Sequence, residues 1–276
     1  MKDFLEVKGL LRPAYAKINR TLEVYGVRDD GFHELRSIVQ AIALSDILTF
    51  DTTDDGEVTS DTGYGEKDLI VRAAKALRAA CGAIDEKACG VHVSVEKRIP
   101  AGGGLGGGSA DAAATLLTLN KLWRCEKTPE ELAAIGASVG SDVPALVLAQ
   151  AYRAPILMEG RGERVKVLPK EPGEAKPLLL VHPGVASATA EVYAKCAART
   201  SPATGAVNDL QAAACTLHPE IAMALVALTA AGATDVMMSG SGSVVYGFAD
   251  DMGSAEAIAS RMRAIGCRVW VTAVLS

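Results

Sequence analysis

A glycine-rich run, IPAGGGLGGGSADAAATLLTLNKLW, occupies residues 99–123 and constrains the chain more than any other stretch; six of residues 102–108 are glycine. Glycine lets the main chain take positive φ and lets other groups approach it closely. A helical pattern follows at once, with Ser109 as the expected N-cap and Asp111 suited to the positive end of the helix dipole. The helix carries one apolar stripe, made of Ala112, Leu116, Leu119 and Trp123. Free N–H groups that lead into a helix N-terminus bind anions, most often phosphate, and a flexible linker would need neither cap nor amphipathic helix.

Two familiar phosphate loops fit this run poorly. Gly102, Gly104 and Gly107 match the G-x-G-x-x-G of dinucleotide-binding proteins, but that fold needs a second parallel strand after the helix, and here another helical pattern follows. The Walker A loop fails because Ser109 and Ala110 stand where it needs Lys and Ser/Thr. The first match still leaves a nicotinamide-dependent oxidoreductase open as an alternative.

Composition narrows the class of protein. The chain has 276 residues, of which 49% are hydrophobic and 22% charged, as in an ordinary globular protein with a sizeable core. A net charge of −5 argues against a nucleic-acid binder. The N-terminal stretch contains acids and no long apolar core, and no apolar run reaches membrane-spanning length. We therefore expect a cytoplasmic protein that binds neither nucleic acid nor membrane.

The cysteines and histidines are scattered. The six cysteines contain no C-x-x-C pair, and the four histidines complete no zinc pattern. Six reduced thiols are the expectation for a cytoplasmic protein. No metal ligands can be assigned from the sequence.

Periodicity predicts the elements between the motifs. Period-two alternation predicts strands at 15–24, 91–95 and 268–274, and helical spacing predicts helices at 68–81, 129–139 and 255–265, the last capped by Ser254. Residues 178–182 form a short apolar strand, and 237–248 form two strand-like runs joined by small residues, as in a hairpin. No internal repeat is evident.

Several polar residues lie near these elements and have ordinary structural explanations. Lys17 and Asn19 share one face of the 15–24 strand, which by periodicity alone is equally well a solvent-facing side. Asp142 precedes a helix whose first turn holds Pro144, so a helix cap is the simplest role for its carboxylate.

Four motifs together resemble the GHMP family of small-molecule kinases. They are A-K-I-N at 16–19, D-G-F-H-E at 30–34, P-A-G-G-G-L-G-G-G-S at 100–109 and G-S-D-V-P at 140–144, with M-S-G-S-G at 238–242 as a further glycine turn. They follow the family's order and span most of the chain. The family's glycine pair after the G-S-D-V-P helix is missing, although a G-x-G-E turn remains at 160–163. Homoserine kinases, galactokinases and mevalonate kinases carry other motifs near their start and fit less well.

The resemblance implies an α+β fold of two domains. These would be an N-terminal nucleotide-binding domain like ribosomal protein S5 domain 2, at 1–155, and a C-terminal ferredoxin-like α/β sandwich, at 156–276. It also implies phosphorylation by ATP with Mg²⁺. The closest branch of the family phosphorylates the C2 hydroxyl of a cytidine diphosphate-linked methylerythritol in the non-mevalonate route to isoprenoids. Another GHMP kinase, or a non-catalytic nucleotide-binding domain, stays open as an alternative, and the sequence does not give the oligomeric state.

The resemblance also assigns roles to residues. Lys17 and Asp142 would act on the reacting hydroxyl, Asp142 as its base. The ATP phosphates would be held by the loop, made of Pro100, Ala101, Gly102, Gly103, Gly104, Leu105, Gly106, Gly107, Gly108, Ser109 and Ala110. The acceptor would be held by Asn19, Phe32, His33, Thr189 and Tyr193. Phe32 stands where the family usually has tyrosine. Phenylalanine keeps a ring for stacking but lacks the hydroxyl. Asn208 and Asp209 would support the cleft.

Overall fold

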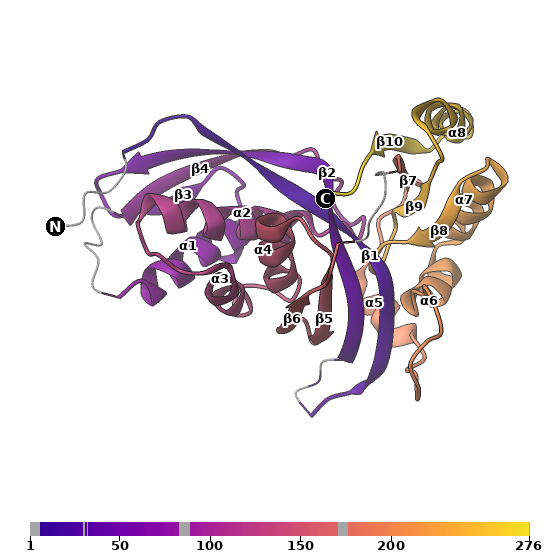
Figure 1. Cartoon of the computed structure of the whole chain (residues 1–276), viewed down its shortest axis with the longest axis horizontal. Helices are drawn as coiled ribbons and strands as arrows, with labels where there is room; N and C mark the ends of the chain where they lie inside the picture. The colour runs from indigo at the N-terminus through magenta and orange to yellow at the C-terminus, as the bar shows by residue number, and fades with distance from the viewer. Residues whose placement is uncertain (1–5, 30, 32, 83–88, 171–175, 276) are drawn as a thin grey trace.

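The computed structural model describes residues 6–29, 31, 33–82, 89–170 and 176–275, and two sheets organise them (Figure 1). The first sheet has the order β3-β4-β2-β5-β6, with β1 paired to β2. Its strands are β1 (Leu10–Val27), β2 (His33–Thr53), β3 (Val58–Ser60), β4 (Gly90–Glu96), β5 (Ile156–Gly160) and β6 (Arg164–Val167). The second sheet has the order β10-β7-β9-β8. Its strands are β7 (Leu178–His182), β8 (Thr234–Met238), β9 (Val245–Phe248) and β10 (Arg268–Thr272).

Helices pack on one face of the first sheet (Figure 1). They are α1 (Leu69–Ala80), α2 (Gly107–Leu122), α3 (Pro129–Gly136) and α4 (Val143–Tyr152), with the 3-10 turn η1 (Gly65–Lys67) before α1. Residues of the apolar stripe predicted for α2 are all buried. Asp68 caps α1 by accepting a hydrogen bond from the Ile70 N–H at 2.9 Å, and Thr128 forms a capping box with Glu131 on α3. The sequence therefore fixes this helical layer through both burial and capping.

The second sheet carries its own helices and its own core. These are α5 (Thr189–Lys195), α6 (Leu210–Leu217), α7 (Pro219–Ala230) and α8 (Met252–Ala264). Leu179 and Val181 of β7 face this second core, whereas Leu178 and Leu180 face the core of the first sheet. In the part of the chain that the structure describes, no single helix is both long and apolar enough to cross a membrane. Only α6 and α7 together reach that length and composition, and they meet at 115°.

The ribbon of β1 and β2 joins the two halves of the molecule. Both strands are long and antiparallel, and Figure 1 shows them running from the helical layer past α5. The predicted strand at 15–24 lies within β1. Ile18 packs in the core of the first sheet, while Leu22 and Val24 pack in the core of the second. A single strand therefore ties both cores together.

The position of the domain boundary follows from the strand pairing. β5 pairs with β2, and β6 pairs with β5, so both strands extend the first sheet. A boundary at residue 155 would separate them from that sheet. We propose that the two domains divide between Val167, where β6 ends, and Leu178, where β7 begins.

The antiparallel pairing also excludes the dinucleotide alternative. α2 is followed by α3 and α4, and of the strand pairs in the first sheet only β3 with β4 is parallel. A dinucleotide-binding unit requires parallel strands on either side of its first helix. The oxidoreductase interpretation of the glycine run is therefore wrong.

Two predicted helix caps are also wrong. α2 begins at Gly107, with Gly106 in the N-cap position at φ 69°, so Ser109 lies inside the first turn. α8 begins at Met252, because Asp251 accepts a hydrogen bond from the Ser254 N–H at 2.7 Å. In both cases a residue just before the predicted cap provides the conformation or the acceptor that starts the helix.

The prediction of six reduced thiols is wrong for one pair. Cys81, at the C-terminal end of α1, forms a disulfide with Cys125, in the loop after α2. The other four cysteines, Cys89, Cys196, Cys215 and Cys267, do not form a disulfide with one another. Wide spacing in sequence hid the pair, since α1 and α2 pack side by side and bring the two helix ends together.

Candidate active site

A cleft of about 810 Å³ lies where the two halves meet. Its lining comes from segments far apart in sequence. They are β1, the start of β2, the glycine loop and start of α2, the start of α4, the turn between β5 and β6, α5, and the glycine turn after β8. Both domains are therefore needed to form it.

Lys17 lies at the centre of this cleft, with its side chain only 4% exposed. The Lys17 ammonium donates to Asn19 Oδ1 at 2.6 Å and to the Gly104 carbonyl at 2.9 Å. It also lies 3.5 Å from a carboxylate oxygen of Asp142. An ammonium group has three N–H donors. Asn19 and Gly104 accept from two of these N–H groups and so fix the side chain. The third N–H group can point toward Asp142 and the cleft.

Irregularities in β1 direct Lys17 and Asn19 into the cleft. The pairing register with β2 shifts between Tyr15 and Lys17, and again between Asn19 and Thr21. Such bulges re-aim side chains out of the regular alternation. Asn19 is buried and donates to Ser37 Oγ at 2.8 Å, so its amide is fixed with the oxygen toward Lys17.

Asp142 has the position of a helix cap but does not act as one. It stands at the N-cap of α4, and its side chain makes no capping hydrogen bond. The carboxylate is 31% exposed and lines the cleft opposite Lys17. The alternative explanation of this residue, a cap, is therefore not supported by the geometry.

The glycine loop forms one wall of the cleft. Gly102, Gly104 and Gly106 all take positive φ, at 65°, 73° and 69°. Gly107, Gly108 and Ser109 make up the first turn of α2, and the N–H groups of a first turn have no partner within the helix. All six residues line the cleft. The wall therefore presents main-chain N–H donors and the positive end of the α2 dipole, which together suit phosphate.

The other predicted loop residues stand behind this wall. Leu105 is buried, and its carbonyl accepts from the Lys17 N–H at 3.0 Å. A Cβ on Gly103 would lie 2.8 Å from Val244. Pro100, Ala101 and Ala110 are not among the lining residues.

A second glycine turn, residues 239–244 after β8, holds the first one in place. The Ser243 N–H donates to the Gly102 carbonyl at 3.1 Å, and Ser239 Oγ donates to the Gly104 carbonyl at 3.0 Å. A Cβ on Gly104 would lie only 2.0 Å from the Ser239 carbonyl oxygen, so no other residue fits there without movement. Asn208 Nδ2 in turn donates to the carbonyls of Met238 and Gly240, both at 2.8 Å. Asn208 thus braces the turn.

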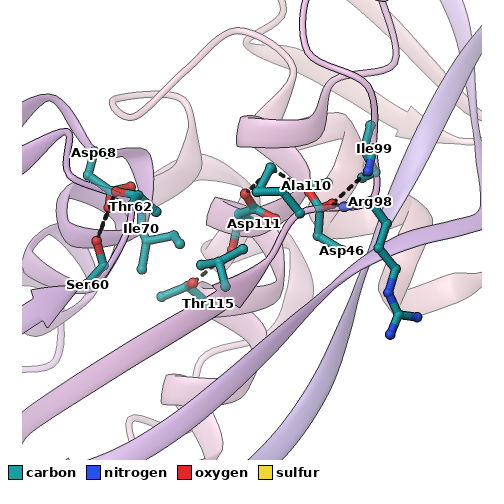
Figure 2. Close-up of polar contacts among 12 residues, drawn as sticks. Asp46, Ser60, Thr62, Asp68, Ile70, Arg98, Ile99, Ala110, Asp111 and Thr115 are labelled. Atoms are coloured by element: carbon teal, nitrogen blue, oxygen red, sulfur yellow. Dashed lines mark hydrogen bonds and ion pairs between the residues drawn. The ribbon is translucent and has the colours of Figure 1, made fainter.

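Two buried acids anchor the start of the loop and of α2 (Figure 2). Asp46, on β2, accepts from the main-chain N–H groups of Arg98 and Ile99 at 2.5 and 2.8 Å. Lys97 bridges Asp46 and Asp111, with its ammonium 2.8 Å from Asp111. Lys97 is therefore committed to these carboxylates.

Burial raises the pKa of Asp111 to about 7, against the opposing effect of Lys97 and with a further increase from Asp46. Burial lowers the pKa of Lys97, but the two acids raise it above its usual value overall. One oxygen of Asp111 has no hydrogen-bond partner among the described residues. This cluster thus supports the N-terminus of α2 from behind and changes charge near neutral pH.

Aromatic rings from β2 and α5 also line the cleft. The rings of His33 and Tyr193 lie 5.1 Å apart at 40°. Burial raises the pKa of the Tyr193 hydroxyl, and the charge of Asp142 raises it further. Thr189 Oγ1, one turn before Tyr193 on α5, lies 2.9 Å from Ser241 Oγ. Phe32 lies outside the described residues.

Some lining residues were not predicted from the sequence. Arg161 lines the cleft from the turn between β5 and β6, and Ser141, Ser187 and Ser241 line it from three other segments. Ser187 Oγ donates to the Ser241 carbonyl at 2.8 Å. The G-x-G-E turn did signal the place of Arg161, but only the fold brings that turn to the cleft.

The described residues contain no group of three or more His, Cys, Asp or Glu side chains arranged to hold a metal. Asp142 is the one carboxylate among the described residues that line the cleft. Mg²⁺ is typically held by one or two carboxylates together with substrate phosphates, so this donor set fits Mg²⁺ only in company with a bound nucleotide.

Comparison with known proteins agrees with this arrangement. The family model for the GHMP kinase N-terminal domain matches residues 68–150, and the model for the GHMP kinase C-terminal domain matches residues 198–266. The chain is 39% identical to the 4-diphosphocytidyl-2-C-methyl-D-erythritol kinase of Moorella thermoacetica, over 92% of this chain and 95% of the relative.

Solved structures give the same result for the fold. A crystal structure of a 4-(cytidine 5'-diphospho)-2C-methyl-D-erythritol kinase matches with a TM-score of 0.81 and 32% identity, over 97% of this chain and 100% of that one. Homoserine kinase from Cytophaga hutchinsonii matches at a TM-score of 0.69 and 18% identity, over 100% and 98% of the two chains, which shows a shared fold alone. With both family models matched and a relative aligned over nearly its whole length, the chain belongs to the GHMP kinase family.

Proposed function

We propose that this protein transfers the γ-phosphoryl group of ATP to the C2 hydroxyl of 4-diphosphocytidyl-2-C-methyl-D-erythritol, in the non-mevalonate pathway to isoprenoid precursors. The observation that carries the proposal is the Lys17–Asp142 pair, 3.5 Å apart, in a cleft that is also lined by the glycine loop and by the His33 and Tyr193 rings. Relatives that carry this name match the chain over most of its length.

In this mechanism Asp142 is the general base. Its carboxylate accepts the proton of the attacking hydroxyl as the new O–P bond forms and the bond to the β-phosphate oxygen breaks, releasing ADP. A general base must lie within hydrogen-bond reach of the proton that it takes. Asp142 is open to the cleft, and its carboxylate makes no capping bond that would turn it away.

Lys17 supplies the fixed positive charge. The ammonium is held by Asn19 and Gly104, and its remaining donor points to the region beside Asp142. There it stabilises the oxygen of the acceptor as that oxygen loses its proton. Because the group is almost fully buried and already oriented, it needs little reorganisation during the transfer.

The loop at 100–110 would bind the ATP phosphates. The N–H groups of the first turn of α2 provide donors, and the positive-φ glycines let the phosphates approach the main chain. Mg²⁺, held through the phosphate oxygens of the bound nucleotide, would neutralise phosphate charge.

The acceptor would be oriented by groups remote from the reacting hydroxyl. Tyr193, His33 and Phe32 would hold the cytosine base by stacking and hydrogen bonds, and Thr189 and Asn19 would bind polar atoms of the acceptor. Binding of these remote groups aligns the hydroxyl with the phosphate and so lowers the barrier to transfer.

The test is a phosphorus NMR assay of the purified protein with ATP, Mg²⁺ and 4-diphosphocytidyl-2-C-methyl-D-erythritol. We expect a new phosphomonoester signal together with ADP, and none with Asp142→Asn. Parallel reactions with homoserine and mevalonate test other GHMP kinase activities. Transfer to either of these, or ATP binding without any transfer, would overturn the assignment.

A further inference from the structure

We propose that Asp111, held between Lys97 and Asp46 behind the glycine loop, is a positioning residue whose charge sets how tightly the loop binds phosphate groups. This inference rests on the proposed function in taking the glycine loop as the phosphate site. Asp111, Lys97 and Asp46 are not among the described residues that line the cleft. Asp111 would therefore act through the first turn of α2 and not through contact with the nucleotide.

The three side chains lie directly against the wall of the cleft. A Cβ on Gly107 would lie 3.5 Å from the Lys97 ammonium, and Gly107 is both the first residue of α2 and a lining residue. Asp111 stands about one turn further along the helix, and its carboxylate lies 2.8 Å from the same ammonium. A change of charge at Asp111 therefore changes the electrostatic potential at the first turn, whose N–H groups have no partner within the helix.

The same cluster fixes the chain that leads into the glycine loop. Asp46 is fully buried on β2 and accepts from the main-chain N–H groups of Arg98 and Ile99. Lys97 bridges Asp46 to Asp111. The cluster thus joins the segment before the loop to the helix after it, so the position of the loop and the charge of the cluster are linked.

Asp111 is the member of the cluster whose charge changes near neutral pH. Its side chain is only 5% exposed, and one of its oxygens has no hydrogen-bond partner among the described residues. Burial of an ionised carboxylate with an unpartnered oxygen is costly, and the like charge of Asp46 adds to that cost. These effects place the pKa of Asp111 at about 7, although Lys97 opposes them.

The neighbouring elements leave this balance to the cluster itself. The charges that act on Asp111 are those of Lys97 and Asp46. α2 also packs against β1, α1, α3 and α4. Charged groups of these elements are bonded to other partners; they are Lys17 of β1, Asp68 at the N-cap of α1, Arg72 of α1, Glu130 and Glu131 of α3, and Asp142 at the N-cap position of α4.

The charge of the cluster has a direct consequence for phosphate binding. When Asp111 is neutral, the charges of Lys97 and Asp46 cancel, and when Asp111 ionises, the cluster carries one net negative charge. A negative charge beside the first turn weakens the attraction of its N–H groups and of the helix dipole for phosphate. Phosphate affinity should therefore fall as the pH rises through about 7. By linkage, bound phosphate favours the neutral form of Asp111, so binding takes up a proton near this pH.

The experiment measures binding of ADP with Mg²⁺ by calorimetry between pH 6 and pH 8, at each pH in two buffers with different enthalpies of ionisation. Asp111→Asn stays neutral, so its pH profile reports the titration of ADP itself and of every other group. Relative to this variant, wild type should lose affinity by about fivefold or more from pH 6 to pH 8, a typical size for coupling between two sites. Wild type should also take up more protons on binding at pH 7.5. Asp250→Asn removes an exposed carboxylate of the second domain and is the matched control, with the profile of wild type.

A second variant tests the same balance from the opposite charge. Lys97 lowers the pKa of Asp111, so in Lys97→Met the fall in affinity should move to higher pH. A fall that stays at the same pH, or moves lower, would contradict the coupling.

The outcomes separate the two proposals. If wild type binds no ADP at any pH, the ATP site of the proposed function falls, and this inference falls with it. If wild type binds ADP with the same pH profile and the same proton uptake as Asp111→Asn, only the role of Asp111 is overturned. Far-UV circular dichroism of each variant at both ends of the pH range confirms the fold.

Discussion

Lys17 Nζ lies 3.5 Å from Asp142 Oδ2, although one residue comes from the first strand and the other from the start of the fourth helix. Asn19 and Gly104 fix the lysine, and no capping bond engages the aspartate. The two charged groups therefore lie together, and both line the cleft.

Replacing either member of this pair should abolish most of the rate. We expect Asp142→Asn to lower kcat by about 10²–10⁴, because a positioned general base is typically worth that factor. Lys17→Ala should cost a similar factor. The double variant should lose little more than either single one, since the two groups act on one proton. Steady-state kinetics test this, with ATP affinity by calorimetry expected to survive. Near-full kcat in Asp142→Asn would mean that the carboxylate is not the base.

Gly104→Ala should disrupt the junction of the two glycine turns. Its Cβ would lie 2.0 Å from the Ser239 carbonyl, and its φ is 73°. We expect a lower Tm and an ATP affinity reduced tenfold or more, because the wall that presents the N–H donors must move. Gly266→Ala is the control, with φ of 91° and open space around the new Cβ. It tests backbone strain alone and should leave ATP binding unchanged. Equal loss of Tm in both variants would contradict the close contact.

Tyr193→Ala and Phe32→Ala should each raise the KM for the cytidyl acceptor. Loss of a stacked ring typically costs about 1–3 kcal/mol, which corresponds to roughly 5–150-fold. The KM for ATP should change little, because the glycine loop, and not these rings, is the proposed site of the ATP phosphates. Tyr193→Phe keeps the ring and should stay near wild type. If the alanine variants raise the KM for ATP and leave the KM for the cytidyl acceptor unchanged, the ATP site and the acceptor site have been assigned in reverse.

Because of Asp111, the free energy of unfolding should fall as the pH rises. Its pKa is about 7 in the folded chain, against 3.8 for an aspartate in an unfolded chain, so between these values the folded state binds more protons than the unfolded state. Stability from this group is therefore present below pH 3.8 and lost as the pH rises through 7. We expect Asp111→Asn to gain in free energy of unfolding relative to wild type between pH 5 and pH 8, measured by urea unfolding. A constant difference across that range would show that Asp111 is ionised throughout.

The Cys81–Cys125 disulfide should stabilise the helical layer. The two cysteines are 44 residues apart in sequence, and closing a loop of this size typically contributes about 2–4 kcal/mol. Cys81→Ser should lower Tm under oxidising conditions and match the wild type in dithiothreitol. Cys196→Ser, at a free cysteine, should show no such dependence on reductant. Alkylation of both thiols without prior reduction would mean that the bond is absent in the purified protein.

The sequence by itself determined the local elements and the anion-binding loop. Asp68 and the apolar spacing set α1, and glycines set the positive-φ positions at 102, 104 and 106. The stripe predicted for α2 is buried, but so are successive residues from 110 to 116, so this helix is not buried on one face alone. These features depend on neighbours three or four residues away, or on one residue's own φ and ψ, so they can be derived from a short window. The family resemblance added roles for Lys17 and Asp142 that periodicity left open.

Only the tertiary structure decided what meets in the cleft. Bulges in β1 bury Lys17 on a face that alternation allows to be exposed, and the Ser239 turn closes over Gly104 from the other domain. The Cys81–Cys125 bond and the place of Gly162 next to Ser141 depend in the same way on how helices and strands pack. Such contacts join residues tens to hundreds of positions apart. Their geometry is set by the packing of whole elements around two cores, which no local pattern of side chains encodes.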